Sequence, residues 1–182
     1  MSQQASNALL AARNAEAAEE AGVREFLAFV VATETYALPL SCIREIMRVP
    51  SVTAVPRAPR EVLGIISVRG QVTTLIDLRE RLRVQAAPVS SRTRVLLVDQ
   101  GDEIMGLLCD RVQQVHRLSE KEVEMASVLG SDAASYVMGI GRPGQLKADA
   151  HGEATPEETG DDAEILILLD PIALLKRQVA HV

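Results

Sequence analysis

The chain has 182 residues, which suffices for one ordinary domain or two very small ones, and it is 47% hydrophobic but only 2% aromatic. The net charge of −6 is concentrated in residues 145–164, QLKADAHGEATPEETGDDAE, which hold seven carboxylates and one lysine. Because the rest of the chain is nearly neutral and has few aromatic faces on which bases could stack, we expect no nucleic-acid partner.

The first 24 residues are rich in Ala and Glu and end close to Gly22, a plausible helix stop. We expect a mobile N-terminal extension here, in the form of a frayed helix or a disordered tail. Its acidic residues and lack of a long apolar stretch are unlike a signal peptide. No apolar run approaches the about 18 residues needed to span a bilayer. The sequence therefore predicts a cytoplasmic protein without direct membrane insertion.

From Glu25 onward, short apolar runs rich in Val, Ile and Leu are separated by turn signals, a texture that favours strands. The expected strands span residues 25–32, 35–40, 43–49, 63–68, 71–77, 94–99, 103–109, 112–117, 136–141 and 164–170. Short helices are expected at Pro59–Leu63, Leu78–Leu82, Ser119–Met125 and Pro171–Lys176. The third helix would begin with a capping box, and the fourth has proline at its first position.

The connections between these strands are too short for crossover helices, so antiparallel pairing should dominate. Gly101 and the Arg69-Gly70 pair are expected in tight hairpin turns. A mainly β chain of this length could form one sandwich or two small barrels. Residues 145–164 interrupt the strand series and are expected to form a solvated, mobile excursion.

One motif suggests a nucleotide site. GIGRPG at residues 139–144 spells the GxGxxG pattern of dinucleotide-binding turns. However, Pro143 precedes the last glycine, and a polar segment follows where a helix is needed. A strand end that continues into a loop is therefore the favoured interpretation, and a small nucleotide-dependent enzyme is the alternative.

The remaining reactive side chains form no catalytic or metal-binding pattern. His116, His151 and His181 lack metal-ligand spacing, and a surface strand position is favoured for His116. Cys42 and Cys109 are far apart and surrounded by apolar residues, which predicts buried free thiols. We therefore expect no enzymatic activity, no metal and no cofactor.

Charged residues inside the apolar runs are the feature that stands out. Arg44, Glu45 and Arg48 lie in SCIREIMRV, and Arg69 lies in ISVRGQV. An unpaired charge at a half-buried strand position is unfavourable, so such residues pair with one another or lie where a partner covers them. They could also simply point outward from a two-faced sheet.

Four blocks of the sequence resemble, in order and spacing, the CheW coupling proteins of bacterial chemosensory systems. The blocks read EFLAFVVATETYALPLSCIREIM, GIISVRGQVTTLIDLRERL, RVLLVDQGDEIMGLLCDRVQQVHRLSEKEVE and EILILLDPIALL. The resemblance implies a mainly β fold of two five-stranded SH3-like β-barrels that share a hydrophobic core, with a few short helices. It also implies a CheW-like domain over residues 25–176, which includes the acidic excursion and leaves a tail at 177–182.

By this resemblance the protein is a non-enzymatic adaptor at receptor arrays. It would couple the cytoplasmic hairpin tip of a chemoreceptor to the regulatory domain of a CheA-type histidine kinase. The receptor tip would dock in a groove between the barrels, where the matching positions are Ile43, Glu45, Ile46, Met105, Gly106 and Leu107. The expected kinase-binding positions are Gly64, Val68 and Arg69, with Ile65 more plausible as a core residue. We further hypothesise that Glu45 and Arg69 pair across the barrel junction. A scaffold or competitor that binds the kinase without coupling it to receptors is the alternative.

Overall fold

The computed structural model describes residues 22–85, 88–99, 101, 103–125, 135–144, 146–148, 154–156 and 164–176. The predicted N-terminal extension and C-terminal tail, with His181, lie almost wholly outside this set, as does most of the acidic excursion with His151. In the described part no helix is both long and apolar enough to cross a membrane.

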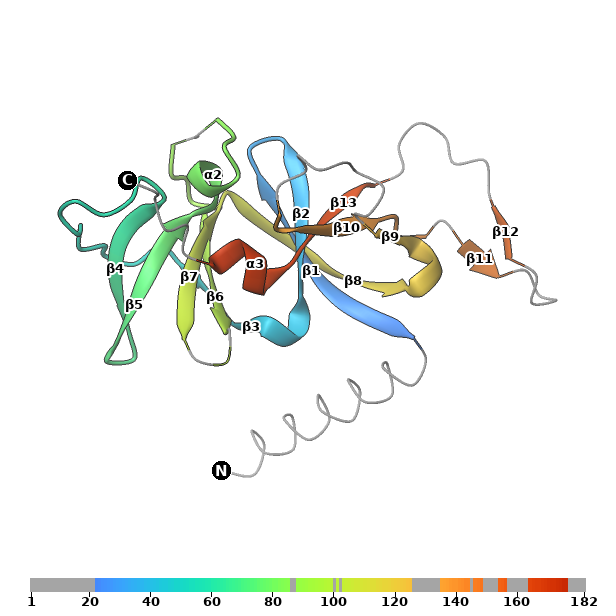
Figure 1. The fold of residues 1–182 in the computed structure, drawn as a ribbon, viewed down its shortest axis with the longest axis horizontal. Coiled ribbons are helices and arrows are strands. Elements are labelled where there is room, and N and C mark those ends of the chain that lie inside the picture. The colour runs from blue at the N-terminus through green and yellow to red at the C-terminus, as the bar shows by residue number, and fades with distance from the viewer. Residues whose placement is uncertain are drawn as a thin grey trace, which may run out of the picture.

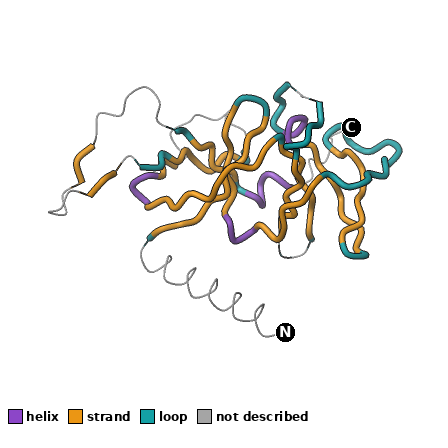
Figure 2. The backbone as a smooth tube through the Cα atoms, turned by 180° about the vertical axis from the view of Figure 1, so that it is seen from behind, coloured by secondary structure: helices purple, strands orange, loops and turns teal. Residues whose placement is uncertain are grey.

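Two β-sheets lie side by side and form the body of the molecule (Figure 1). The five-stranded sheet has the order β3-β6-β7-β5-β4, with β3 (Ile43–Arg48), β4 (Val62–Val68), β5 (Gln71–Asp77), β6 (Arg94–Asp99) and β7 (Ile104–Cys109). The six-stranded sheet has the order β8-β1-β2-β13-β10-β9, with β1 (Val23–Val31), β2 (Glu34–Pro39), β8 (Arg111–Ser119), β9 (Val123–Met125), β10 (Val137–Gly141) and β13 (Leu166–Leu169). Strands make up most of the described chain when the molecule is seen from behind (Figure 2).

Each sheet buries apolar side chains on both of its faces. One cluster, which includes Phe26 and Leu168, belongs to the six-stranded sheet, and a second, which includes Ile66 and Leu97, belongs to the five-stranded sheet. A third and larger cluster draws residues from both sheets, among them Phe29 from β1 and Leu107 from β7. Two barrel interiors are thus joined by a shared core, in which side chains touch across the junction.

In both sheets, the strand that pairs in parallel is followed by a short helix with an aspartate at its N-cap. β5 pairs in parallel with β7, and β13 pairs in parallel with β2. Asp77 caps α2 (Leu78–Arg81), and Asp170 caps α3 (Pro171–Leu175), each by accepting backbone N–H groups of the first turn. α3 lies between the two sheets in Figure 1, and Leu174 and Leu175 pack into the shared core.

The mainly β fold of two small barrels with a shared core is confirmed, and all ten predicted strands are present with ends shifted by up to two residues. The six-stranded sheet gains the short β9, which was expected to be the end of a helix. Ser119 does form the capping box, but only Glu120–Glu122 turn as a 3-10 helix before the chain becomes extended.

The predicted helix at Pro59–Leu63 is wrong. Val62 already begins β4, and Thr53 pairs with Ile65 through two backbone hydrogen bonds of 2.9 Å each. The preceding segment therefore lies along the edge of the sheet as an extended chain with turns. The acidic excursion also contains regular structure, because Leu146–Ala148 (β11) pairs antiparallel with Ala154–Pro156 (β12).

Candidate functional site

The first candidate feature is a hollow beside the β4–β5 turn, which we call the turn-side hollow. It has a volume of about 510 Å³ and is lined by Arg44, Glu45, Val68, Arg69, Gln71, Thr73, Leu97 and Ile104. β3 supplies one wall and the β4–β5 hairpin supplies the other. Charged and apolar side chains therefore share one concave surface.

The β4–β5 turn presents Arg69 to solvent. Val68 pairs with Gln71, which leaves Arg69 and Gly70 as the two turn residues, with φ of 51° and 85°. Positive φ at both positions is the pattern of a type I′ hairpin turn, for which glycine is favoured. The predicted tight turn is confirmed, and it leaves the Arg69 side chain 82% exposed.

Arg69 and Glu45 form an ion pair in which the nitrogen and oxygen are 2.9 Å apart. The hypothesis of pairing is confirmed, but its location at the barrel junction is wrong. Both residues belong to the five-stranded sheet, where β3 and the β4–β5 turn approach each other. The pair therefore bridges the two sides of one hollow in one barrel.

A second ion pair stands next to the first. Arg44 pairs with Asp99, and its Nε donates a hydrogen bond of 2.6 Å to the carboxylate. The pKa of Asp99 lies below its ordinary value because the Gly101 N–H donates to the carboxylate, and Arg44 adds a hydrogen bond and positive charge. The turn-side hollow thus presents two arginines, each with one carboxylate partner.

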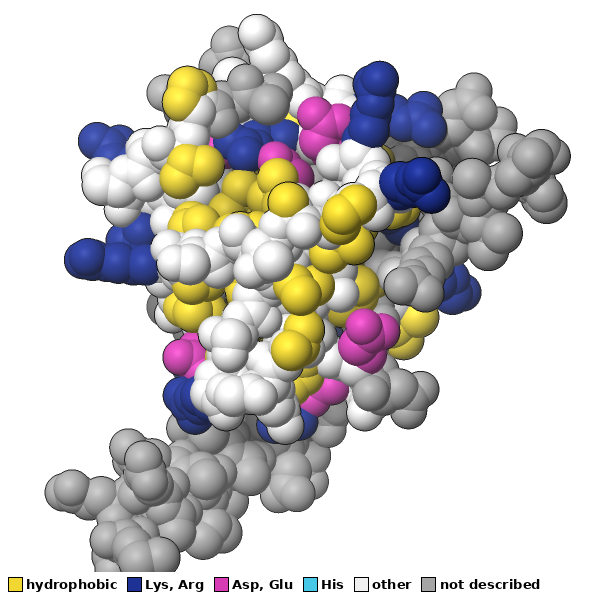
Figure 3. Space-filling model, turned by 90° about the vertical axis from the view of Figure 1, so that its left-hand side faces the viewer, with side chains coloured by type: hydrophobic (Ala, Val, Ile, Leu, Met, Phe, Trp, Pro, Cys, Tyr) yellow, Lys and Arg dark blue, Asp and Glu magenta, His cyan; other side chains and the backbone are white. Residues whose placement is uncertain are grey.

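A second hollow, which we call the apolar hollow, lies on another part of the five-stranded sheet. It has a volume of about 520 Å³ and is lined by Val55, Pro56, Arg57, Ala58, Pro59, Glu61, Val62, Ile65, Thr74, Ile76, Arg81, Met105 and Leu175. The segment before β4 forms its outer wall, and the end of α3 contributes Leu175. Figure 3 shows hydrophobic side chains gathered across this side of the molecule, with Lys and Arg around them.

A buried arginine holds one corner of the apolar hollow. Arg81 donates to both carboxylate oxygens of Glu61 at 3.0 Å, to the Leu174 carbonyl at 2.8 Å and to the Lys176 carbonyl at 2.6 Å. The last carbonyls of a helix have no hydrogen-bond donor within the helix, and Arg81 donates to two such carbonyls at the end of α3. This Arg81–Glu61 clamp holds α3, which follows β13 of the six-stranded sheet, against the five-stranded sheet.

The expected receptor-binding residues do not all reach the surface. Leu107 is fully buried in the shared core, so its placement in a surface groove is wrong. Gly106 is buried too, and a Cβ there would lie 3.1 Å from side-chain atoms of both Leu75 and Val95. Its small size serves the packing of the barrel interior.

The other four members of the expected receptor set are divided between two faces of the sheet. Ile43 and Ile46 lie opposite Val98 and Leu96, which point into the shared core. Glu45 lies opposite Leu97, which points into the barrel interior. Since side chains alternate along a strand, Glu45 is on the face opposite to that of Ile46. Ile46 is 42% exposed, whereas Met105 is 7% exposed and lines the apolar hollow.

The expected kinase-binding residues also have different surroundings. Val68 and Arg69 line the turn-side hollow together. Gly64 is buried at φ +150°, and a Cβ there would lie 2.2 Å from the Thr53 carbonyl oxygen. Gly64 therefore admits the close approach of the segment before β4 and cannot itself offer a side chain. Ile65 is half-buried and lines the apolar hollow, and its neighbour Ile66 is the core residue.

Arg79 forms a buried ionic cluster that the residue pattern did not predict. Its guanidinium donates to both oxygens of Asp77 at 2.8 Å and to Asp110 at 3.3 Å. The hydrogen bond with Asp77 raises the pKa of Arg79 further above its ordinary value. Asp110 also accepts the Ala32 backbone N–H, so the cluster joins the start of α2 to the β1–β2 turn.

The GIGRPG segment is part of the fold. β10 ends at Gly141 and is followed by a turn and by β11, so the helix that a dinucleotide site requires is not there. A Cβ at Gly139 would lie 2.3 Å from the Glu124 carbonyl oxygen. Glycine is therefore needed at this position so that β9 can approach closely. The prediction of a strand end continuing into a loop is confirmed.

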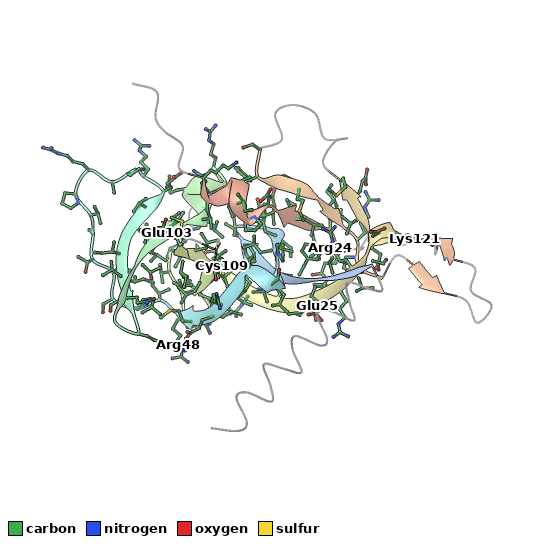
Figure 4. The ribbon with its side chains drawn as sticks, turned by 60° about the horizontal axis from the view of Figure 1, so that its bottom comes forward. Arg24, Glu25, Arg48, Glu103, Cys109 and Lys121 are labelled. Carbon is green, nitrogen blue, oxygen red and sulfur yellow. The ribbon has the colours of Figure 1, made fainter. Side chains whose placement is uncertain are left out.

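His116 is buried, so the prediction of a surface strand position for it is wrong. Its Nε2 has no hydrogen-bond partner among the residues that the structure describes, and it lies 3.8 Å from a carboxylate oxygen of Glu164. The prediction of a buried free thiol is confirmed for Cys109, whereas Cys42 is only half-buried against the shared core. Figure 4 labels Cys109 in the middle of the molecule and Arg48 near its edge. Within the described ranges, no three or more His, Cys, Asp or Glu side chains are grouped so that they could hold a metal ion.

The fold and its hollows define a class of molecule, a pair of small β-barrels that share one core and carry open surface hollows. A family model described as the CheW-like domain matches residues 25–179, and the chain belongs to this family. Family membership supports a general role as a chemotaxis adaptor or scaffold.

Curated relatives agree with this assignment. The chain is 33% identical over 120 residues to the chemotaxis protein CheW of Helicobacter pylori, which covers 66% of this chain and 73% of that protein. It is 30% identical over 120 residues to the chemotaxis protein CheW of Rhizobium meliloti, and this match spans 65% of this chain and 77% of that protein. The crystal structure of the scaffolding protein TtCheW from Thermoanaerobacter tengcongensis has the same fold, with a TM-score of 0.68, 24% identity and coverage of 85% and 94%.

Proposed function

We propose that this protein is a non-enzymatic adaptor that couples the cytoplasmic hairpin tips of chemoreceptors to a CheA-type histidine kinase. The single observation that carries the proposal is the exposed Arg69–Glu45 pair in the turn-side hollow. Two unlike charges fixed beside apolar lining residues, of which Ile104 is exposed, suit a surface that recognises a protein partner. Membership in the CheW-like family supports the choice of chemosensory partners.

Receptor recognition is assigned to the edge of the five-stranded sheet. A helical hairpin needs an apolar strip to pack against and charges that fix its register. Ile43 and Ile46 offer the strip on one face of β3, and Glu45 supplies a carboxylate at the same sheet edge from the opposite face. Met105, which pairs with Val98 and is 7% exposed, offers the receptor little surface of its own.

Kinase recognition is assigned to the β4–β5 turn. Val68 and Arg69 lie together at this turn, and the regulatory domain of the kinase is the proposed partner. Gly64 acts indirectly, because it lets the segment before β4 lie close to the strand. With both partners bound, the protein would reside in the cytoplasm at receptor arrays.

Separate titrations test this proposal. The purified chain is titrated with a receptor-tip fragment and, in a second experiment, with the regulatory domain of a CheA-type kinase, with calorimetry as the readout. The adaptor account predicts that both bind and that each still binds when the other is present. Binding to the kinase domain alone would instead support a scaffold or competitor. Binding to neither would contradict the proposed function.

A further inference from the structure

Positive charge is left uncompensated at the rim of the apolar hollow. Glu61 is the only carboxylate among the lining residues, and Arg81 neutralises it through a two-fold hydrogen bond. Arg57 lines the hollow, and Arg60 lies between two lining residues in sequence; both are exposed. Neither has an ion-pair partner in the part of the chain that the structure describes.

Arg57 occupies a backbone position that ordinarily favours glycine. The Ala58 N–H donates to the Val55 carbonyl at 3.3 Å, which closes a four-residue turn with Pro56 second and Arg57 third. Arg57 has φ of 62°, and proline followed by a residue of positive φ is the pattern of a type II turn. Keeping an arginine in this left-handed conformation is unfavourable, and residues held in this way cluster at binding sites.

The interior of the hollow is suited to an apolar side chain. Ile76 and Met105 form a buried floor, at 4% and 7% exposure, and Val55 is 42% exposed at the wall. The Arg81–Glu61 clamp fixes the end of α3, so Leu175 keeps its place among the lining residues. Water in such a hollow has few polar partners, so an entering apolar group is favoured.

We propose that the apolar hollow binds a protein segment that inserts a leucine-sized side chain between acidic flanking residues, with Arg57 and Arg60 pairing with those acids. The occupant is an acidic amphipathic helix of a partner protein. Charge complementarity selects it, because Arg57 and Arg60 are the charges without an ion-pair partner among the described residues at the rim. This docking site is additional to the Arg69–Glu45 pair, and its existence does not depend on the coupling activity.

Two synthetic helical peptides test the proposal with the full chain. Both carry the same pair of leucines at positions i and i+4; glutamates flank them in one peptide and lysines in the other. Fluorescence anisotropy should show that the glutamate peptide binds at least tenfold more tightly. Raising the salt concentration from 0.05 to 0.5 M should reduce this preference, because exposed charges are screened within a few ångströms at high salt.

Variants locate the binding in the hollow. The double variant Arg57→Glu/Arg60→Glu should reverse the preference between the peptides, while Val55→Ser should weaken both by at least threefold. Arg92→Glu is the matched control, because Arg92 is exposed and outside both hollows, and it should change nothing. All three exchange exposed side chains, so each should keep its melting temperature.

Equal affinity for the two peptides, or a double variant that keeps the original preference, would overturn the proposal. Neither receptor nor kinase is in this assay, so its failure is distinct from a failure of the coupling function.

Discussion

Replacement of Arg69 by alanine separates the stability of the fold from partner recognition. The Arg69 side chain is 82% exposed and its partner Glu45 is 37% exposed, so solvent screens the ion pair. Exposed pairs contribute about 0.2–1 kcal/mol to stability. For a chain of this size, 1 kcal/mol corresponds to about 2–4 °C in melting temperature. Arg69→Ala should therefore lower the melting temperature by no more than about 4 °C.

The effect on binding should be much larger if a partner covers the pair. Truncation of one member of a buried interfacial charge pair costs about 2–5 kcal/mol, so Arg69→Ala should weaken kinase binding at least about thirtyfold. Arg117 provides the matched control, since it pairs with Glu25 at 2.8 Å and is 70% exposed, on the other sheet. Arg117→Ala should have the same small effect on stability and leave the affinity unchanged.

Charge reversal tests the pair itself. Glu45→Arg and Arg69→Glu should each be destabilising, and the double variant should recover part of the loss because the pair is restored in reverse. A double variant that is no more stable than expected from the sum of the two single changes would refute pairing. Kinase affinity that is unchanged by Arg69→Ala would refute the assignment of the turn as a binding surface.

Three further predictions concern the scaffold and its thiols. Arg81→Met should lower the free energy of unfolding by about 2–4 kcal/mol, because it leaves Glu61 and two carbonyls without partners. The control Arg83→Met, at an exposed position, should change it by less than about 0.5 kcal/mol. Equal effects of the two variants in urea titrations would contradict the clamp. Gly64→Ala should cost more than about 2 kcal/mol by the same measurement, because its Cβ would meet the Thr53 carbonyl at 2.2 Å, and a neutral result would show that the segment before β4 moves freely. Burial raises the pKa of Cys42 to about 11 and that of Cys109 to about 12, so both thiols should resist alkylation at pH 8 until the protein is unfolded. Since the unfolded thiols ionise at lower pH than the folded ones, stability should also fall as the pH rises above about 9, and rapid native alkylation would contradict this environment.

The sequence predicted strand positions well because each strand is a short apolar run between turn residues. It could not show which face a residue occupies where both faces are buried. β7 is the clearest case, since IMGLLC has no alternation of polar and apolar residues, and its last five residues are buried. The family resemblance placed Leu107 in the receptor-binding set, and nothing in the pattern of β7 showed that it belongs to the core.

Contacts between distant parts of the chain were also beyond the sequence pattern. Arg81 meets Glu61 across 20 residues and the Lys176 carbonyl across 95 residues. No local spacing rule connects positions so far apart. The segment VPRAPR carried no such signal either, because it contains two Pro-Arg pairs and only Arg57, not Arg60, has positive φ. The pairing of Glu45 with Arg69 came from family resemblance, and the structure corrected its location.

The most direct test of the account is a reconstitution of signalling. A CheA-type kinase and a receptor fragment are combined with and without this protein, and kinase activity is measured with Arg69→Ala as the comparison variant. The account predicts that the receptor fragment changes kinase activity only when the unaltered protein is present, and that Arg69→Ala reduces the change. Identical kinase activity with and without the protein would contradict the proposed coupling role.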